Sequence, residues 1–127
     1  MTIKLGVIGG SGVYAVDDLD APSTLDIATP FGRPSGSITE GTLNGMPVVF
    51  LPRHGAGHTL TPTEVPYRAN VFALKSIGVT HLLSVSAVGS LREDYPPRSL
   101  VAPDQIIDRT SKRSHSFFEG GIVAHVG

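Results

Sequence analysis

The sequence contains no cysteine or tryptophan among its 127 residues, and only 17% of them are charged. The absence of cysteine excludes disulfide frameworks, thiolate zinc sites and a cysteine nucleophile, and it suits a cytoplasmic protein. Ten Lys and Arg against eleven Asp and Glu give a net charge of −1. No positive excess is therefore available for a nucleic-acid interface or an anionic membrane surface. The apolar runs are only a few residues long, which predicts no transmembrane helix.

The residues that are present have the order of an α/β protein. Hydrophobic residues make up 40% of the sequence, which excludes extensive disorder, and the length suits one domain. Asn44-Gly45 between two apolar stretches is a strong hairpin signal. Apolar residues three and four apart predict a helix that ends before Gly78. We expect strands at 3–8, 37–43, 46–51, 82–88 and 100–107, a helix at 67–77 and an irregular polar connection at 15–24.

This order predicts an α/β fold with a mixed sheet. Only the helix at 67–77 is available to cover that sheet, although an α/β sheet normally has both faces covered. The sequence ends at Gly127, just after an apolar run. We therefore interpret the chain as a domain that is incomplete at its C-terminus or that needs a partner.

A glycine-rich loop, Gly9-Gly10-Ser11-Gly12, follows the first predicted strand. Glycines let the backbone approach an oxyanion, and the N–H groups and the Ser11 hydroxyl can donate to it. The alternative is a tight turn without a ligand. No Gly-Lys-Ser/Thr follows, which excludes a Walker A loop. Val13-Tyr14 stand where the third glycine of a dinucleotide fingerprint is expected, so a Rossmann-type nucleotide binder rests on this loop alone.

Arg53 and His54 come directly after the strand predicted at 46–51. A guanidinium offers a planar fork for phosphate oxygens, so the pair is a candidate anion clamp. The alternative is a solvated arginine beside a capping histidine. His54 and His58 have the spacing of a zinc pair on a helix, but the glycine and proline residues around them argue against a helix. We expect no metal site here.

Ser86 stands at a third strand end, after the run that begins at 82. Open α/β sheets bind ligands beyond the carboxyl ends of their strands. Ser11, Arg53, His54 and Ser86 are therefore expected to converge, and their coincidence carries more weight than any one of them.

Six sequence motifs occur in order along the chain. They are Gly6-Val7-Ile8-Gly9-Gly10-Ser11-Gly12, Thr29-Pro30-Phe31-Gly32, Arg53-His54-Gly55 with His58, Tyr67-Arg68-Ala69-Asn70, Ala87-Val88-Gly89-Ser90-Leu91, and Asp104-Gln105 with Ile107-Asp108-Arg109-Thr110. Together they resemble the 5′-methylthioadenosine phosphorylase branch of the purine nucleoside phosphorylase family. The resemblance implies a nucleoside phosphorylase-like mixed sheet that closes partly into a barrel with surrounding helices. Residues 1–127 would be its N-terminal, phosphate-binding half, and the protein would be a homotrimer.

The resemblance also implies a reaction. Inorganic phosphate attacks C1′ of 5′-methylthioadenosine or a related purine nucleoside, and the products are the base and 5-methylthioribose 1-phosphate. This pentosyl transfer belongs to purine and methionine salvage and uses no metal or organic cofactor, since phosphate is itself a substrate.

The resemblance assigns two sets of residues to the site. The first set would bind phosphate and consists of Ser11, Arg53, His54 and Ser86. The second would contact the nucleoside and consists of Ala87, Val88, Gly89 and His125, the last of which would reach the 5′-substituent pocket of a neighbouring subunit. No carboxylate of this segment matches the family's proton donor to the leaving base, so no catalytic residue is identified.

Three function classes stay open at this point. Family chains are roughly twice as long, beyond the length of one small domain, and the remaining half carries the base-recognition loops. The sequence is therefore expected to be the phosphate-binding half of an enzyme. The alternatives are a non-catalytic fragment or assembly module of the same fold, and a Rossmann-type nucleotide-binding domain.

Overall fold

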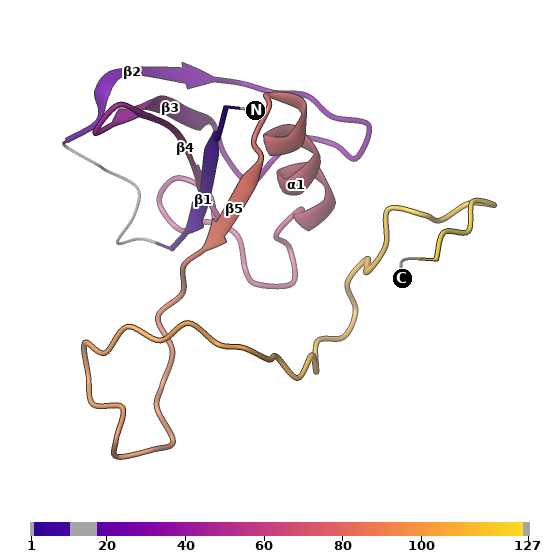
Figure 1. Cartoon of the computed structure of the whole chain (residues 1–127). Coiled ribbons are helices and arrows are strands. Elements are labelled where there is room, and N and C mark those ends of the chain that lie inside the picture. Colours follow the sequence, from indigo (N-terminus) through magenta and orange to yellow (C-terminus); the bar gives the residue numbers. More distant parts are fainter. Residues whose placement is uncertain (1, 11–17, 126–127) are drawn as a thin grey trace.

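The computed structural model describes residues 2–10 and 18–125. They form a five-stranded sheet with a helix packed against it, and a long C-terminal segment, residues 85–125, leaves the sheet (Figure 1). The elements are β1 (Leu5–Gly9), β2 (Asp20–Leu25), β3 (Ile38–Leu43), β4 (Met46–Pro52), α1 (Tyr67–Ser76) and β5 (His81–Ser84). The strand order is β2-β3-β4-β1-β5, with β1 parallel to β4 and β5 and the other pairs antiparallel. This mixed sheet confirms the predicted α/β class.

The hairpin between β3 and β4 follows the sequence signal. Asn44 and Gly45 both have positive φ, 49° and 78°, as a two-residue hairpin turn of this kind requires. Pro47 is the second residue of β4, and the pairing of β4 with β1 begins only at Val48. The N–H that proline lacks is therefore not needed for a hydrogen bond between β4 and β1.

Helix α1 covers one face of the sheet with the side of the helix that carries Ala69, Asn70, Ala73 and Leu74. Gly78 follows the helix with φ of 85°, the conformation that favours glycine after a helix. Val71 is one of the regularly spaced apolar residues from which the helix is predicted, but it lies outside the buried side and is 39% exposed. No helix in the described ranges is long and apolar enough to cross a bilayer. The core cluster consists of Ile8, Ile38, Val49, Leu51, Ala73, Leu74 and Val79.

The sequence predicts an irregular connection at residues 15–24, and this prediction is wrong for its second part, because strand β2 begins at Asp20. Its sequence includes Pro22 and several polar residues, which weaken a strand signal. The structure accommodates them at the outer edge of the sheet, where β2 pairs only with β3 and its register shifts between Asp20 and Ser23. Edge positions and bulges are where sheets tolerate proline.

Two further strand predictions are corrected. The strand expected at 82–88 is only four residues long, and Leu82 and Leu83 are 47% and 49% exposed. β5 is exposed because it is the last strand of the sheet and pairs only with β1. Residues 100–107 form no strand in the described structure. Figure 1 shows this part of the chain away from the sheet, where β-branched residues have no ladder to join.

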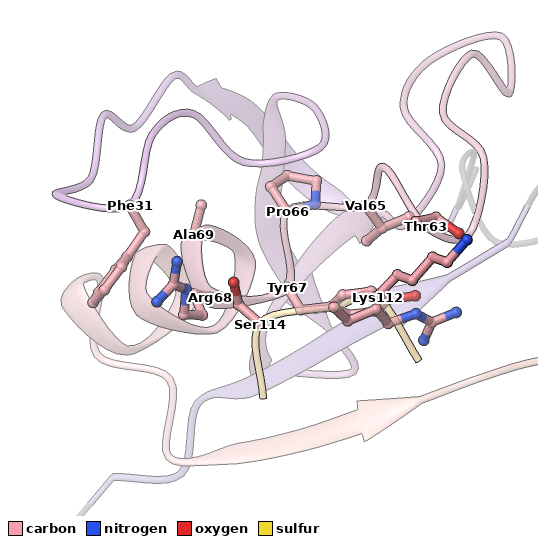
Figure 2. Close-up of a pocket in the computed structure, with 10 residues that line it drawn as sticks. Phe31, Thr63, Val65, Pro66, Tyr67, Arg68, Ala69, Lys112 and Ser114 are labelled. Carbon is pink, nitrogen blue, oxygen red and sulfur yellow. The ribbon is translucent and has the colours of Figure 1, made fainter. Parts of the chain in front are cut away.

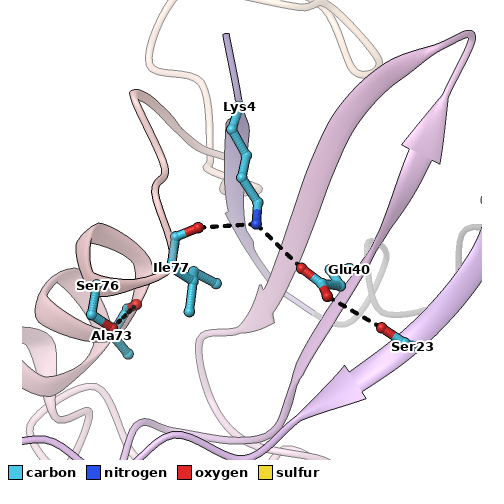
Figure 3. Close-up of polar contacts among 6 residues, drawn as sticks. All are labelled: Lys4, Ser23, Glu40, Ala73, Ser76 and Ile77. Atoms are coloured by element: carbon cyan, nitrogen blue, oxygen red, sulfur yellow. Dashed lines mark hydrogen bonds and ion pairs between the residues drawn. The ribbon is translucent and has the colours of Figure 1, made fainter. Parts of the chain in front are cut away.

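Lys4 connects the start of β1 to both β3 and the end of α1 (Figure 3). Its Nζ forms an ion pair with Glu40 Oε2 at 3.2 Å and donates to the Ile77 carbonyl at 3.0 Å. Ser23 donates from β2 to the other Glu40 oxygen at 3.4 Å. Because the last carbonyls of a helix lack intrahelical partners, the ammonium group satisfies one of them while it joins the two layers.

Asn70 joins the buried side of α1 to the loop before β3. Its side chain is 1% exposed, and its Oδ1 accepts from the Ser35 N–H at 2.8 Å. Ser35 in turn donates from Oγ to the Pro52 carbonyl at 2.6 Å, at the end of β4. This chain of hydrogen bonds connects the helix to the residue before Arg53.

We predict that Asn70→Ala lowers the free energy of unfolding by about 1–3 kcal/mol, because the buried Ser35 N–H loses its acceptor. Urea denaturation followed by circular dichroism measures the change. Val71→Ala is the matched control, and it should shift stability by no more than about 0.5 kcal/mol, as expected for a position without a buried partner. Equal losses in the two variants would contradict a structural role for the Asn70 amide.

Candidate functional site

The carboxyl ends of three parallel strands meet at one edge of the sheet. β1 lies between β4 and β5, and the residues that follow its two neighbours are hydrogen-bonded to its end. Arg53 N donates to the Gly9 carbonyl at 2.9 Å, and Val85 N donates to the Ile8 carbonyl at 2.9 Å. These bonds place the chain after β4 beside the chain after β5, although the two are more than thirty residues apart.

The Arg53 guanidinium spans the two strand ends. Its Nη1 donates to the Ser86 hydroxyl and to the Val85 carbonyl, the latter at 3.4 Å, and its Nε donates to His54 Nε2 at 3.2 Å. Its Nη2 lies 3.6 Å from the position that a Cβ on Gly10 would take. The structure therefore places three of the sequence-predicted residues, Arg53, His54 and Ser86, in one hydrogen-bonded group.

His54 is held by the loop that follows it. Its ring is buried, with 9% of the residue exposed, and Nδ1 lies 2.9 Å from the Leu60 carbonyl. The His58 ring stacks on it with centroids 4.6 Å apart. Both ring nitrogens of His54 are thus engaged by protein atoms. Among the described residues, no group of three or more His, Cys, Asp or Glu side chains is arranged to hold a metal ion.

The remaining predicted residues do not join this group. Ser11 lies outside the described residues. The run from Ala87 to Gly89 follows Ser86 as exposed chain, with Val88 86% exposed. His125 is exposed near the far end of the C-terminal segment, and Figure 1 shows that end of the segment away from the strand ends.

Two contributions to the site escaped the sequence analysis. The Leu60 carbonyl holds His54, and the Val85 carbonyl accepts from Arg53. Both are main-chain atoms, so no side-chain pattern identifies them. Gly10 of the predicted glycine-rich loop lies beside the arginine fork, where a Cβ would make an ordinary van der Waals contact with Arg53 Nη2 at 3.6 Å.

The loop from the site to α1 ends in a charged turn. Glu64 Oε2 accepts from the Thr61 N–H at 2.9 Å and from the Thr61 hydroxyl at 2.7 Å. These hydrogen bonds favour the ionised carboxylate and hold the pKa of Glu64 below its ordinary value. The turn leads directly into Pro66 and the first turn of the helix.

A separate pocket of about 230 Å³ lies between the start of α1 and residues 112–114 (Figure 2). The Arg113 guanidinium lies 5.0 Å from the centroid of the Tyr67 ring, and Arg68 pairs with Glu119 at 2.8 Å. Phe31 closes another side and packs edge-on against Phe117. The pocket shares no lining residue with the strand-end group.

Comparison with known proteins identifies a family model described as "Phosphorylase superfamily", which matches residues 4–127. S-methyl-5′-thioadenosine phosphorylase from Chloroflexus aurantiacus is 60% identical over 123 residues, and that from Gloeobacter violaceus is 56% identical over 124 residues. These alignments cover 96% and 98% of this chain but only 43% and 42% of the relatives. The chain therefore spans less than half the length of the curated relatives that it matches.

Solved structures agree. A methylthioadenosine phosphorylase from an antarctic soil metagenomic library superimposes with a TM-score of 0.92 at 52% identity, covering 99% of this chain and 44% of that one. The Schistosoma mansoni methylthioadenosine phosphorylase in complex with tubercidin gives 0.86 at 43% identity, covering 93% and 41%. The family resemblance and the nucleoside phosphorylase-like fold are thereby confirmed. Nothing in these matches supports the Rossmann-type alternative.

Two glycines in the loop after Arg53 allow a matched test of its geometry. Gly55 and Gly57 have φ of 77° and 74°, but a Cβ on Gly55 would lie 3.0 Å from both the Ser35 carbonyl and Thr59 Oγ1. Gly57 has only one atom near that position, at 4.0 Å. We predict that both alanine substitutions carry the left-handed backbone cost, roughly 1–2 kcal/mol.

Gly55→Ala should lower the free energy of unfolding by a further amount of about 1–3 kcal/mol, because its Cβ overpacks this site. The measurement is the free energy of unfolding of both variants. Because both carry the same left-handed backbone cost, the difference between them reports the overpacking at Gly55 alone. If Gly57→Ala is the more damaging substitution, the close packing of Gly55 against Ser35 is wrong.

Proposed function

The chain belongs to the phosphorylase superfamily, and from that membership we propose that it is part of an enzyme that cleaves a purine nucleoside with inorganic phosphate. The proposed substrate is 5′-methylthioadenosine, the compound in the names of the relatives. Residues 1–127 would be the phosphate-binding half of a single domain. The whole protein would act as a cytoplasmic homotrimer in purine and methionine salvage, without a metal or organic cofactor.

One observation carries the proposal: Arg53 and Ser86 come from different strand ends and meet through a hydrogen bond. The Ser86 hydroxyl accepts from the arginine, so its own proton remains available for an anion. The planar guanidinium can present its outer N–H groups to phosphate oxygens at the same edge. The Arg53 and Ser86 donors support phosphate binding at this edge, and Ser11 and His54 are the further proposed members of the site.

The reaction transfers the pentosyl group from the base to phosphate. The C1′–N9 bond breaks, its electron pair leaves with the purine, and a phosphate oxygen forms the new bond to C1′. Positive charge that develops on the ribose is stabilised by the phosphate anion, so holding that anion in line is the main contribution of this half. We propose that the main chain of Ala87, Val88 and Gly89 lies along the nucleoside and that His125 serves a neighbouring subunit.

A second candidate function is a non-catalytic assembly module of the same fold. The observation in its favour is the exposure of apolar residues along the C-terminal segment. Leu91 and Leu100 are fully exposed, and Ile107 is 88% exposed. Apolar surface of this kind marks contacts with further protein. A module of this type would keep its partner surface and show no phosphate-dependent chemistry, so the assays below separate the two functions.

The activity test uses a chimera in which residues 1–127 replace the matching part of the Chloroflexus aurantiacus relative. We predict phosphate-dependent release of adenine from 5′-methylthioadenosine by the chimera and none by the 127-residue chain alone. The isolated chain lacks a carboxylate that matches the donor to the leaving base, and general acid catalysis is typically worth ~10²–10⁴-fold. A folded but inactive chimera would contradict the proposed function.

Binding of phosphate is tested on the 127-residue chain itself. Arg53→Ala should weaken phosphate binding roughly 10- to 100-fold in calorimetric titrations, because hydrogen bonds to charged groups contribute about 1.5–3 kcal/mol. Arg92→Ala removes an exposed arginine that pairs with Asp94 at 2.6 Å, and it should leave binding unchanged. Equal affinity in the wild type and in Arg53→Ala would remove this edge as the phosphate site.

A further inference from the structure

A continuous line of hydrogen bonds runs through His54 to the strand-end arginine. It begins at the Leu60 carbonyl, which lies 2.9 Å from His54 Nδ1, and it continues from His54 Nε2 to Arg53 Nε at 3.2 Å. From there Arg53 Nη1 reaches the Ser86 hydroxyl. A loop carbonyl is thus connected, through the His54 imidazole and the Arg53 guanidinium, to the Ser86 side chain just beyond β5.

The donors and acceptors along this line determine the tautomer of His54. The Nε of an arginine carries one hydrogen and can only donate, so His54 Nε2 must accept. The ring proton therefore resides on Nδ1 and is donated to the Leu60 carbonyl. In this arrangement the His54 ring has no N–H left for an anion, and Nε2 could donate to phosphate only after gaining a proton and losing the bond from Arg53.

The surroundings of His54 prevent the ring from turning. The residue is 9% exposed, and the Leu60 N–H also donates to the His54 carbonyl at 3.0 Å, so two hydrogen bonds join residues 54 and 60. The His58 ring covers one face, with an angle of 23° between the ring planes. A ring anchored at one nitrogen and covered on a face presents the other nitrogen in one fixed direction.

We propose that the His54 side chain is a positioning residue that aims the Arg53 fork and does not itself contact the anion. A guanidinium is planar, so holding Nε with one bond and Nη1 with another fixes the plane of all three nitrogens. The fork would otherwise have to be ordered each time an anion binds. This inference rests on the proposed phosphate site and assigns His54 a different task within it.

The first test reads the tautomer directly. The ¹⁵N-labelled 127-residue chain is titrated with inorganic phosphate, and its imidazole nitrogens are followed by long-range ¹H–¹⁵N correlation. We expect His54 Nε2 to show the shift of an unprotonated nitrogen in the free chain and at phosphate saturation. Protonation of Nε2, either in the free chain or as phosphate binds, would overturn the inference. If no saturable binding is seen, it is the proposed function that fails, and the role of His54 fails with it.

The second test is a double-substitution cycle with phosphate affinity as the readout. Arg53→Lys keeps the positive charge but removes the Nε–H that His54 accepts. We expect His54→Ala to weaken phosphate binding about tenfold when Arg53 is present, the effect of losing one hydrogen bond to a charged group. In the Arg53→Lys background the same change should cost less than about twofold, because the positioning role has already gone.

Equal losses in both backgrounds would mean that His54 contacts the anion itself and would overturn the inference, while the phosphate site would stand. His115→Ala, an exposed histidine of the C-terminal segment, is the matched control and should bind phosphate like the wild type. If His54→Ala does not fold, the tautomer measurement decides the question without any substitution.

Discussion

The parallel pairing of β1 with β4 on one side and β5 on the other is the constraint on which the site depends. It brings three carboxyl ends to one edge and places Arg53 and Ser86 within hydrogen-bonding distance. The strand residues alternate between the two faces of the sheet, so a shift of β5 by one residue would turn its side chains to the opposite face. The position of Arg53 relative to Ser86 therefore depends on the register of two ladders, in which Ile8 pairs with both Leu51 and Ser84.

Support for this edge comes from the helix as well as from the sheet. The Asn70 amide on α1 holds Ser35, and Ser35 holds the carbonyl of Pro52, the residue before Arg53. The loop beyond Arg53 closes on itself through the two bonds between His54 and Leu60. The side chains of the proposed phosphate site are thus placed by rigid elements and a short closed loop, which limits the ordering that anion binding would require.

The C-terminal segment has a different physical character. It superimposes with the rest of the chain on a relative more than twice as long, with a TM-score of 0.92 over 99% of this chain. Yet Leu100 and Ile107 are exposed along it, and it forms no ladder with the described strands. The β-branched pattern at 100–107 is a preference for a pleated, half-buried surface, and such a preference has no effect without a neighbouring strand.

The sequence by itself determined the α/β class, the hairpin at Asn44-Gly45, the helix that stops before Gly78 and the family, because these depend on local preferences and on motifs in order. The tertiary structure alone decided that Pro22 lies in an edge strand and that β5 is exposed, since both depend on which strands are neighbours. It alone also decided what His54 faces. The Leu60 carbonyl is a main-chain group that every residue type carries, so only the folded loop shows that it holds the imidazole and, through it, the arginine.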